Sequence, residues 1–456
     1  MTRVHLVGIG GAGMSGIARV LLARGTQVSG SDAKDSLGVA ALRALGAEIH
    51  IGHLAAQVEG ATTVVVSTAI RESNPELVAA RALGIPVVKR AEALAALLSG
   101  YTAVAVAGTH GKTSTTSMLT VAAQHCGVDP SFAIGGDLNE AGSNAHHGTG
   151  ALFVLEADES DGSFLAYRPH AAIITNVEPD HLDHHGTAEA YLQAFTDFVA
   201  SVTGLLVVCV DDPGAEALAE GARAAGLTVR TYGTAPRADL QITALRVGAA
   251  GSSYTAMLDG HALGTVSLLV AGEHQARNSA GALLAAIELG LPAAQVIEGL
   301  GGFTGVRRRM ELKGAAGGVR VYDDYAHHPT EVRAQLVAAR AVAGGGRLVA
   351  VFQPHMYSRT ATFADAFGQA LGLADEVVVM EVYGAREDPI PGVTGALVAA
   401  AVPLPAGRVL YEPSWSAVPA AAAARVAPGD LLMTLGAGDV TQIGPEVLRL
   451  LAGGAP

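Results

Sequence analysis

The strongest chemical signal in this sequence is a glycine loop that runs into a lysine and two hydroxyl side chains. It reads Gly108-Thr109-His110-Gly111-Lys112-Thr113-Ser114, after an apolar run at 102–106 and before a predicted helix from about residue 115 to 125. In this setting backbone N–H groups wrap a phosphate, the lysine reaches the terminal phosphates, and Thr113 can bind Mg²⁺. The full phosphate-loop pattern needs glycine where Val106 stands, so we interpret the motif as a shorter variant, with Lys112 on a solvent-accessible loop.

A second glycine loop, Gly8-Ile9-Gly10-Gly11-Ala12-Gly13, follows a predicted strand at 4–7 and opens a predicted helix at 14–22. Asp32 lies about 20 residues further on, as in the dinucleotide-binding fingerprint. Glycines allow the backbone to approach a diphosphate, whose charge the helix N-terminus stabilises. NAD, FAD and a UDP-sugar all carry such a diphosphate, so the motif leaves the ligand open. For both loops, a tight turn without a ligand is the alternative.

Two further strand-like runs end in polar side chains. The first, 152–155, leads into Glu156-Ala157-Asp158-Glu159-Ser160-Asp161. A carboxylate that ends a strand downstream of a phosphate loop is where a hard cation is expected, so we predict Glu156 as a Mg²⁺ ligand. A solvated acidic turn is the alternative, above all for Asp161.

The second run, 173–177, leads into Glu178-Pro179-Asp180-His181-Leu182-Asp183-His184-His185. Three histidines so close together suggest zinc, but no cysteine lies nearby and their spacing does not place them on one helix face. We therefore expect His184 and His185 on a surface loop. His181 is better placed to act beside a Mg²⁺–nucleotide.

The elements that must position these residues form three blocks of short apolar runs alternating with Ala/Leu-rich helical stretches. This alternation predicts α/β domains with parallel sheets. We place the domains at 1–99, 100–305 and 306–456, with a new strand near 101 and a basic run at 307–309. A dehydrogenase needs only the first glycine loop and an ordinary ATPase only the second. A chain with both is expected to bring a nucleotide-linked substrate to ATP.

Composition excludes several classes of protein. The length of 456 residues predicts two to four domains. A composition with 50% hydrophobic and 16% charged residues is typical of a well-packed globular chain. The net charge of −13 argues against a nucleic-acid partner. Two cysteines fit a reducing compartment, and neither a signal peptide nor an apolar run of roughly 18 residues is visible. We expect a soluble, cytoplasmic protein without a membrane partner.

Taken together and in this order, the motifs resemble those of the Mur ligase family, over nearly the whole chain. Besides the four segments above, the resemblance includes Gly272-Glu273-His274-Gln275-Ala276-Arg277-Asn278, Asp324-Tyr325-Ala326-His327-His328-Pro329, Phe352-Gln353-Pro354-His355 and Gly436-Ala437-Gly438-Asp439. It implies three α/β domains: a Rossmann-like N-terminal domain, a central P-loop-type mononucleotide-binding domain and a Rossmann-like C-terminal domain.

The resemblance also implies an activity, in which ATP drives the joining of L-alanine to the lactyl carboxylate of UDP-N-acetylmuramate through an acyl phosphate during peptidoglycan synthesis. The implied UDP-substrate residues are Gly10, Gly11, Gly13, Met14, Ser15, Asp32 and Ser67. The implied ATP residues are Gly108 to Ser114 with His274, Asn278 and Arg309, and Gln275 stands where asparagine is usual. Catalysis is assigned to Lys112, Glu156 and His181, and Mg²⁺ to Thr113, Glu156 and His181.

For the amino acid, the resemblance implies Tyr325, His327 and Arg359. Met356 stands where some relatives have a second arginine and offers no charge, which leaves Arg359 as the candidate partner of the carboxylate. Some relatives that add later residues carry a carbamylated lysine in the central domain, but this chain has no lysine between Lys112 and Lys313.

Two alternative functions remain. One is another ligase of the group, which attaches a peptide to the same sugar nucleotide during wall recycling. Two motifs favour the alanine enzyme over it: Phe352-Gln353-Pro354-His355 and Asp324-Tyr325-Ala326-His327-His328. A nicotinamide-dependent oxidoreductase would use the first glycine loop alone and would leave Lys112 unexplained.

Overall fold

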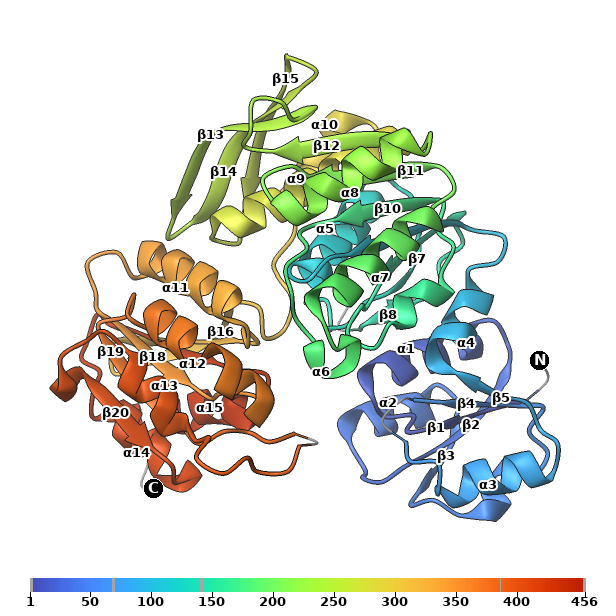
Figure 1. The fold of residues 1–456 in the computed structure, drawn as a ribbon, viewed down its shortest axis with the longest axis horizontal. Coiled ribbons are helices and arrows are strands. Elements are labelled where there is room, and N and C mark those ends of the chain that lie inside the picture. The colour runs from blue at the N-terminus through green and yellow to red at the C-terminus, as the bar shows by residue number, and fades with distance from the viewer. Residues whose placement is uncertain (1–2, 68–69, 140–142, 386, 454–456) are drawn as a thin grey trace. The chain divides into compact units, whose positions relative to one another are not determined.

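The computed structural model describes residues 3–67, 70–139, 143–385 and 387–453 of the chain (Figure 1). It contains three sheets with helices between their strands, which confirms the α/β class. Two compact units are present: Met1–Gln241 with Ala256–Gly264 and Asn278–Leu300, and Ile242–Thr255 with Thr265–Arg277 and Gly301–Pro456. The three domain boundaries drawn from the sequence stay a prediction.

The first sheet is entirely parallel, with the strand order β3-β2-β1-β4-β5. Its strands are β1 (Arg3–Val7), β2 (Gln27–Asp32), β3 (Glu48–Ile51), β4 (Thr63–Val66) and β5 (Val87–Lys89). The connecting helices are α1 (Ala12–Ala23), α2 (Leu37–Ala44), η1 (Ala55–Val58), α3 (Pro75–Ala82) and α4 (Arg90–Leu97). The strand order reverses beside β1, and ligands of such sheets bind at the carboxyl ends of the strands at that point. The first glycine loop leaves β1 there.

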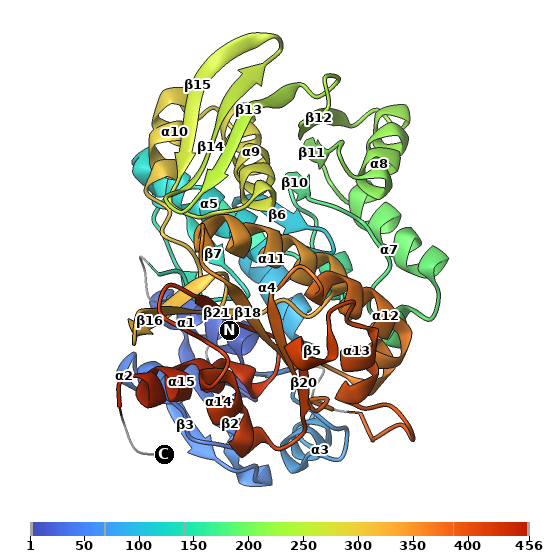
Figure 2. The same ribbon diagram turned by 90° about the vertical axis from the view of Figure 1, so that its left-hand side faces the viewer.

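The second sheet has ten strands in the order β15-β14-β13-β12-β11-β10-β6-β9-β7-β8. These are β6 (Thr102–Ala107), β7 (Ser131–Ala133), β8 (Ala145–His146), β9 (Leu152–Glu156), β10 (Ala171–Ile174), β11 (Leu205–Cys209), β12 (Thr228–Gly233), β13 (Leu240–Gly248), β14 (Gly251–Leu258) and β15 (His261–Leu268). Figure 2 shows the last three as long strands side by side. β6 is parallel to β9 on one side and to β10 on the other, so three loops bearing the predicted motifs leave the same edge.

Helices of this part are α5 (Lys112–His125), η2 (Ser163–Ala166), α6 (Leu182–His185), α7 (Ala188–Ala200), α8 (Pro213–Ala224), α9 (Glu273–Glu288) and α10 (Ala293–Gly301). α5 begins at Lys112, three residues earlier than predicted, because Gly111 adopts a left-handed conformation (φ 84°) as the N-cap. β6 is buried along residues 103–107, as expected of a parallel strand covered on both faces.

The third sheet lies in the second unit, with the order β16-β17-β21-β18-β19-β20, and is parallel except for β16. Its strands are β16 (Glu311–Ala316), β17 (Val319–Asp324), β18 (Leu348–Phe352), β19 (Glu376–Met380), β20 (Val409–Glu412) and β21 (Leu431–Leu435). Its helices are α11 (Pro329–Ala343), α12 (Tyr357–Leu371), α13 (Gly395–Ala401), η3 (Ala406–Arg408), η4 (Trp415–Ala417), α14 (Val418–Ala423), η5 (Asp439–Gln442) and α15 (Ile443–Leu451).

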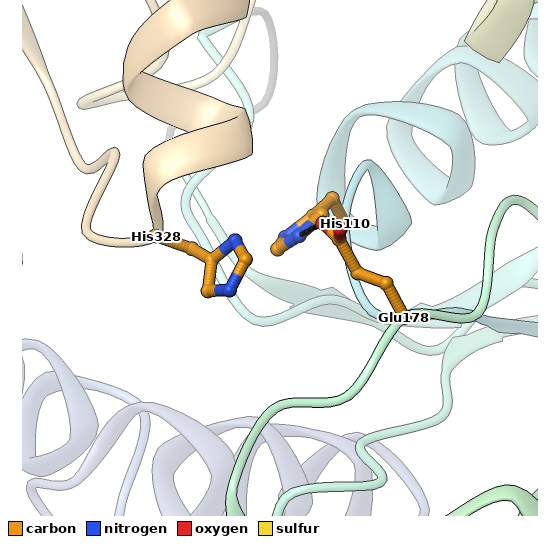
Figure 3. Close-up of side chains that lie close together, drawn as sticks. All are labelled: His110, Glu178 and His328. Atoms are coloured by element: carbon orange, nitrogen blue, oxygen red, sulfur yellow. Dashed lines mark hydrogen bonds and ion pairs between the residues drawn. The ribbon is translucent and has the colours of Figure 1, made fainter. Parts of the chain in front are cut away.

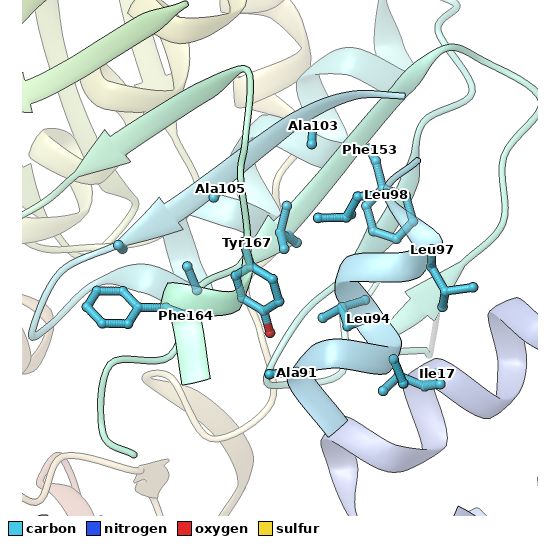
Figure 4. Packing of buried hydrophobic residues seen from close by; sticks show 14 of the residues in the cluster. Ile17, Ala91, Leu94, Leu97, Leu98, Ala103, Ala105, Phe153, Phe164 and Tyr167 are labelled. Atoms are coloured by element: carbon cyan, nitrogen blue, oxygen red, sulfur yellow. The ribbon is translucent and has the colours of Figure 1, made fainter. Parts of the chain in front are cut away.

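One apolar core joins the first two sheets. It includes Ile17 of α1, residues of α4, strands β6 and β9, and the end of η2, as Figure 4 shows with Leu94, Phe153 and Phe164 among others. Each fully buried Leu or Phe side chain contributes about 1.5–3 kcal/mol to folding, so this packing holds α4 firmly between the two sheets. Among the described residues, none of the helices is both long and apolar enough to cross a membrane.

Candidate active site

The phosphate-type loop is shaped by two glycines with positive φ, Gly108 (135°) and Gly111 (84°). Neither position has room for a side chain: a Cβ on Gly108 would overlap Thr175, and one on Gly111 would lie 2.6 Å from Oδ1 of Asn278. The loop is therefore a tight turn between β6 and α5. Asn278 of α9, predicted on the ATP side, lies directly against it.

Lys112 points back into this loop. Its ammonium group donates to the carbonyl oxygens of Gly108 (2.7 Å) and Thr109 (3.0 Å) and forms an ion pair with Glu159 (2.7 Å). Only 13% of the lysine side chain is exposed, so the expected solvent-accessible lysine is instead largely enclosed. The reason is that three acceptors hold its charge in place.

The electrostatics of this pair come from burial and from neighbouring carboxylates. Burial disfavours the charged form of Lys112, but the attraction of Glu159 and Asp158 outweighs it and raises the pKa of the lysine. Burial raises the pKa of the Glu159 carboxyl to about 7, against the opposing effect of Lys112. The lysine thus remains a cation at the centre of an acidic pocket, where a phosphate group would compete with Glu159 for it.

Thr113 and Glu156 are brought together by the structure. The threonine hydroxyl donates to Oε1 of Glu156 (3.0 Å), and the N–H of Gly135 donates to Oε2 (2.7 Å). Both side chains offer oxygen atoms on regular elements, the first turn of α5 and the end of β9. Oxygen atoms of this kind are what Mg²⁺ prefers, so the pair fits the predicted cation.

His110 lies next to Glu178, and Nε2 of its ring contacts a carboxylate oxygen of that residue (Figure 3). His328, also drawn in Figure 3, belongs to the second unit. The loop after β10 supports His110 further, because the side chain of Asn176 accepts from its N–H (2.9 Å) and donates to its carbonyl oxygen (3.0 Å). The two loops at the carboxyl edge of the sheet therefore form one hydrogen-bonded platform.

His181 has a left-handed backbone (φ 52°), and its ring lies 3.6 Å from Asp180 and 4.0 Å from the buried Glu159. It therefore lies in the same cluster as Lys112 and Glu159, whereas its role as a Mg²⁺ ligand beside Glu156 stays a prediction.

His184 is exposed as expected, but His185 is half-buried and its ring contacts the carbonyl oxygen of Glu159 (2.8 Å). The expectation of a surface loop is wrong for His185 because the chain forms the short helix α6 there.

The carboxylate of Asp32 accepts a hydrogen bond from the first glycine loop. Gly10 donates its N–H to Oδ2 of Asp32 (2.9 Å), and a Cβ on Gly10 would lie 2.9 Å from the same atom. Gly8 and Ile9 donate to the carbonyl oxygen of Ser31 at 2.8 and 2.9 Å. Among the other predicted residues, Gly11 caps α1, Gly13 lies in its first turn, Met14 and Ser15 are buried in that helix, and Ser67 follows β4.

The residues predicted around adenine divide between the two units. Asn278 belongs to the first unit, and His274 and Gln275, on the same helix α9, belong to the second. His274 is enclosed, and within the described residues its Nε2 has no hydrogen-bond partner. Burial lowers the pKa of His274 to about 4, and the charges of Arg277 and Arg309 act in the same direction. The ring is therefore neutral near pH 7.

The second unit gathers cations and aromatic rings near the end of β17. The guanidinium groups of Arg308 and Arg309 lie 4.8 and 5.3 Å from the centroid of the Tyr325 ring, and the His327 ring meets the same ring edge-on. Asp324 accepts the N–H groups of Met310 (2.7 Å) and Ala326 (2.8 Å), and burial raises the pKa of its carboxyl to about 7. Tyr325, His327 and Arg309 thus form one cluster.

Arg359, in the first turn of α12, is 7% exposed. Burial acts to raise the pKa of Glu387, but hydrogen bonds from Ser358 and Tyr357, and then the charge of Arg359, lower it overall. Met356 is also buried, with φ at 69°, and is the N-cap of α12. The methionine shapes the turn that presents Arg359. A role of these residues toward an amino acid stays a prediction.

Two residues without a predicted role are part of the site. Glu159 lies in the acidic motif, three residues after Glu156, and the only signal for it was the second glutamate of that motif. Tyr191 of α7 is buried, and its hydroxyl contacts the hydroxyl of Thr109 (2.9 Å) and Glu159 (3.5 Å). No local pattern marks Tyr191, because it reaches the loop only through the fold.

A phosphate-type loop beside a carboxylate–hydroxyl pair, together with a second glycine loop on a separate parallel sheet, is typical of an enzyme that acts on nucleotides. Three family models match the chain: "Mur ligase family, catalytic domain" at residues 3–102, "Mur ligase middle domain" at 106–286 and "Mur ligase, glutamate ligase domain" at 308–438. The chain belongs to the Mur ligase family.

The relatives are similar over nearly their whole length. The UDP-N-acetylmuramate–L-alanine ligase of Saccharopolyspora erythraea is 62% identical, covering 98% of this chain and 93% of that protein. The protein of the same name from Mycobacterium tuberculosis is 56% identical, covering 99% and 95%. Among solved structures, UDP-N-acetylmuramate–alanine ligase from Thermotoga maritima is 28% identical with a TM-score of 0.83, covering 98% of each chain. A murein peptide ligase from Psychrobacter arcticus is 25% identical with a TM-score of 0.72 over the whole of both chains.

Proposed function

We propose that this chain uses ATP to join L-alanine to the lactyl carboxylate of UDP-N-acetylmuramate, in the cytoplasm, as a step of peptidoglycan precursor synthesis. The observation that carries the proposal is the cluster of Lys112, Thr113 and Glu156 at the start of α5. Relatives at 56–62% identity that are named for the alanine reaction favour it over peptide recycling. Among the solved structures, the alanine ligase has the higher TM-score, 0.83 against 0.72 for the murein peptide ligase. A nicotinamide-dependent oxidoreductase would have no role for the phosphate-type loop around Lys112.

In the first step, a lactyl carboxylate oxygen attacks the γ-phosphorus of ATP, which forms an acyl phosphate and releases ADP. Both reactants are anions, so the enzyme must neutralise charge and align them. Lys112 is the cation for this purpose: it must exchange its contact with Glu159 for the γ-phosphate as ATP enters. The N–H groups of the loop and of the first turn of α5 supply further donors.

Thr113 and Glu156 are the residues that would hold Mg²⁺, with His181 as a proposed third ligand, and the ion would neutralise charge on the β- and γ-phosphates. Glu156 is already oriented by two hydrogen bonds, which fixes its oxygens near the loop. In the second step the neutral amine of alanine attacks the acyl carbonyl and phosphate leaves. We assign the carboxylate of alanine to Arg359, and we propose Tyr325 and His327 as further residues that contact the amino acid.

The test is phosphate release measured with ATP, UDP-N-acetylmuramate and each candidate amino acid or peptide in turn. L-Alanine should give the highest kcat/KM. A preference for the tripeptide over alanine would contradict the proposal and favour the recycling reaction.

Arg359→Ala should raise the KM for L-alanine by about 10- to 100-fold, while the KM for ATP changes little. A charge-assisted hydrogen bond to the amino-acid carboxylate is worth roughly 1.5–3 kcal/mol, which corresponds to that range. Arg359→Lys is the matched control, because it keeps the charge and loses the fork of the guanidinium. Steady-state kinetics of both variants give the answer, and equal changes in the two KM values would mean a structural role.

We also predict that the enzyme works without a carbamylated lysine. Carbamylation needs a neutral amine, and the chain from 113 to 312 contains no lysine, while arginine, with a pKa above about 12, cannot supply one. The measurement is activity at mildly acidic pH in CO₂-depleted buffer, with and without added bicarbonate. Activity should be the same in both. Reproducible recovery on adding bicarbonate would show that the assignment of the metal site is wrong.

A further inference from the structure

Arg90 is a cation that lies between the first glycine loop and the acidic segment of the second sheet. It is the first residue of α4, and the aliphatic part of its side chain crosses the first turn of α1: a Cβ built on Gly13 would lie 2.9 Å from both Cδ and Nη1 of Arg90. Its other terminal nitrogen, Nη2, donates to the hydroxyl of Ser163 at 3.2 Å. The guanidinium thus contacts the glycine loop on one side and η2 on the other.

Among the residues that the structure describes, no carboxylate is a direct counter-ion of Arg90. Within the described part of the chain, the bond to Ser163 is its one hydrogen bond and no carboxylate forms an ion pair with it. A guanidinium has five N–H donors, so most of its donors are uncommitted. Burial alone would raise the pKa of Asp158, but the charge of Lys112 and the hydrogen bonds of Ser160 lower it, and the charge of Arg90 adds a smaller lowering effect from further away.

The position is costly for a cation, which suggests a reason beyond stability. The N-terminus of a helix carries partial positive charge and favours anions, yet Arg90 begins α4. The residues that follow it, Ala91, Leu94 and Leu97, are buried in the core shared with Ile17 and Phe153 (Figure 4). α4 therefore holds the arginine in place. A residue that is unfavourable for its local structure, on an element fixed by core packing, is typical of a functional site.

We propose that Arg90 binds the diphosphate of the sugar nucleotide, together with the glycine loop against which it packs. The planar fork of a guanidinium matches the oxygens of a phosphate, and a bound diphosphate would supply an anionic partner for Arg90. The assignment rests on the proposed function, which names a UDP-linked substrate. It adds a residue outside both glycine motifs and gives the loop a cation.

The experiment compares Arg90→Ala and Arg90→Lys with Ser163→Ala, a control that removes the bridge to η2 and keeps the cation. Arg90→Ala should raise the KM for UDP-N-acetylmuramate by about 10- to 100-fold, the range of a lost charge-assisted bond, with the KM for ATP within about threefold of wild type. Arg90→Lys should have a KM for UDP-N-acetylmuramate between those of the wild type and Arg90→Ala. If Arg90→Ala does not fold, Arg90→Lys shows whether the guanidinium fork matters beyond its charge. Ser163→Ala should behave like wild type.

Binding of UDP alone, followed by calorimetry without ATP, identifies the group that Arg90 contacts. UDP carries the diphosphate and lacks the lactyl carboxylate, so Arg90→Ala should weaken its binding as strongly as that of UDP-N-acetylmuramate. The assignment is overturned if UDP binds both proteins equally, if Ser163→Ala reproduces the defect, or if both KM values rise together. Phosphate release by the wild type with UDP-N-acetylmuramate and alanine tests the proposed function separately, because it does not depend on Arg90.

Discussion

Lys112→Ala is expected to lower turnover by about 10²-fold or more, the order of magnitude observed when a preorganised donor at a developing charge is removed. The lysine is the one side chain whose ammonium lies inside the phosphate-type loop, within 3.0 Å of the Gly108 and Thr109 carbonyl oxygens. The charged groups that raise its pKa are the carboxylates Glu159, Asp158 and Glu156, so its loss leaves the loop beside uncompensated negative charge. The measurement is phosphate release at saturating substrates.

The variant also leaves Glu159 buried without its cation, and an uncompensated buried charge destabilises a fold. Glu159 can take up a proton, because burial already raises its pKa to about 7. The matched control is Lys112→Ala combined with Glu159→Gln, which removes the stranded charge. We expect the double variant to recover thermal stability and to remain inactive. Near-normal phosphate release by either variant would contradict the assignment of the ATP site.

The two glycine loops and the strand ends could be predicted because their signals are local. Gly111 and Lys112 follow a buried strand within a few residues, so the turn, the helix start and the phosphate chemistry are all contained in one short segment. Glu156 could be chosen for the same reason, as the first carboxylate at the end of β9. The structure then showed that Thr113 and Glu156, 43 residues apart, share a hydrogen bond.

Other parts of the site depend on contacts between distant segments, and no local pattern marks them. Glu159 becomes the counter-ion of Lys112 only because β6 and β9 are neighbours, and Arg90 meets Gly13 only because α4 packs beside α1. His185 was expected on the surface, since its sequence neighbours are polar, but α6 turns its ring toward Glu159. In each case tertiary packing decides the role of a residue whose type alone leaves it open.

Glu156→Gln should reduce activity most at low Mg²⁺. The expected loss there is about 10- to 100-fold, the range for losing a group that supports a metal site. The substitution keeps the shape of the side chain and removes one negative charge from the proposed cation site. It also places an amide NH₂ opposite either Thr113 or Gly135, both of which donate to Glu156 now. The measurement is phosphate release over a series of Mg²⁺ concentrations, and excess Mg²⁺ should restore part of the activity.

The matched control for Glu156 is Asp161→Asn, which removes the same charge from the same acidic segment. One oxygen of Asp161 accepts the N–H of Ser163 (3.0 Å), and an asparagine can keep that bond. Its activity should therefore depend on Mg²⁺ as the wild type does. A metal ligand shifts the Mg²⁺ concentration that gives half-maximal activity, whereas a residue that only shapes the loop lowers activity equally at every concentration. If the loss in Glu156→Gln is the same across the series, or if Asp161→Asn shifts the series as strongly, Glu156 is not a ligand of the ion.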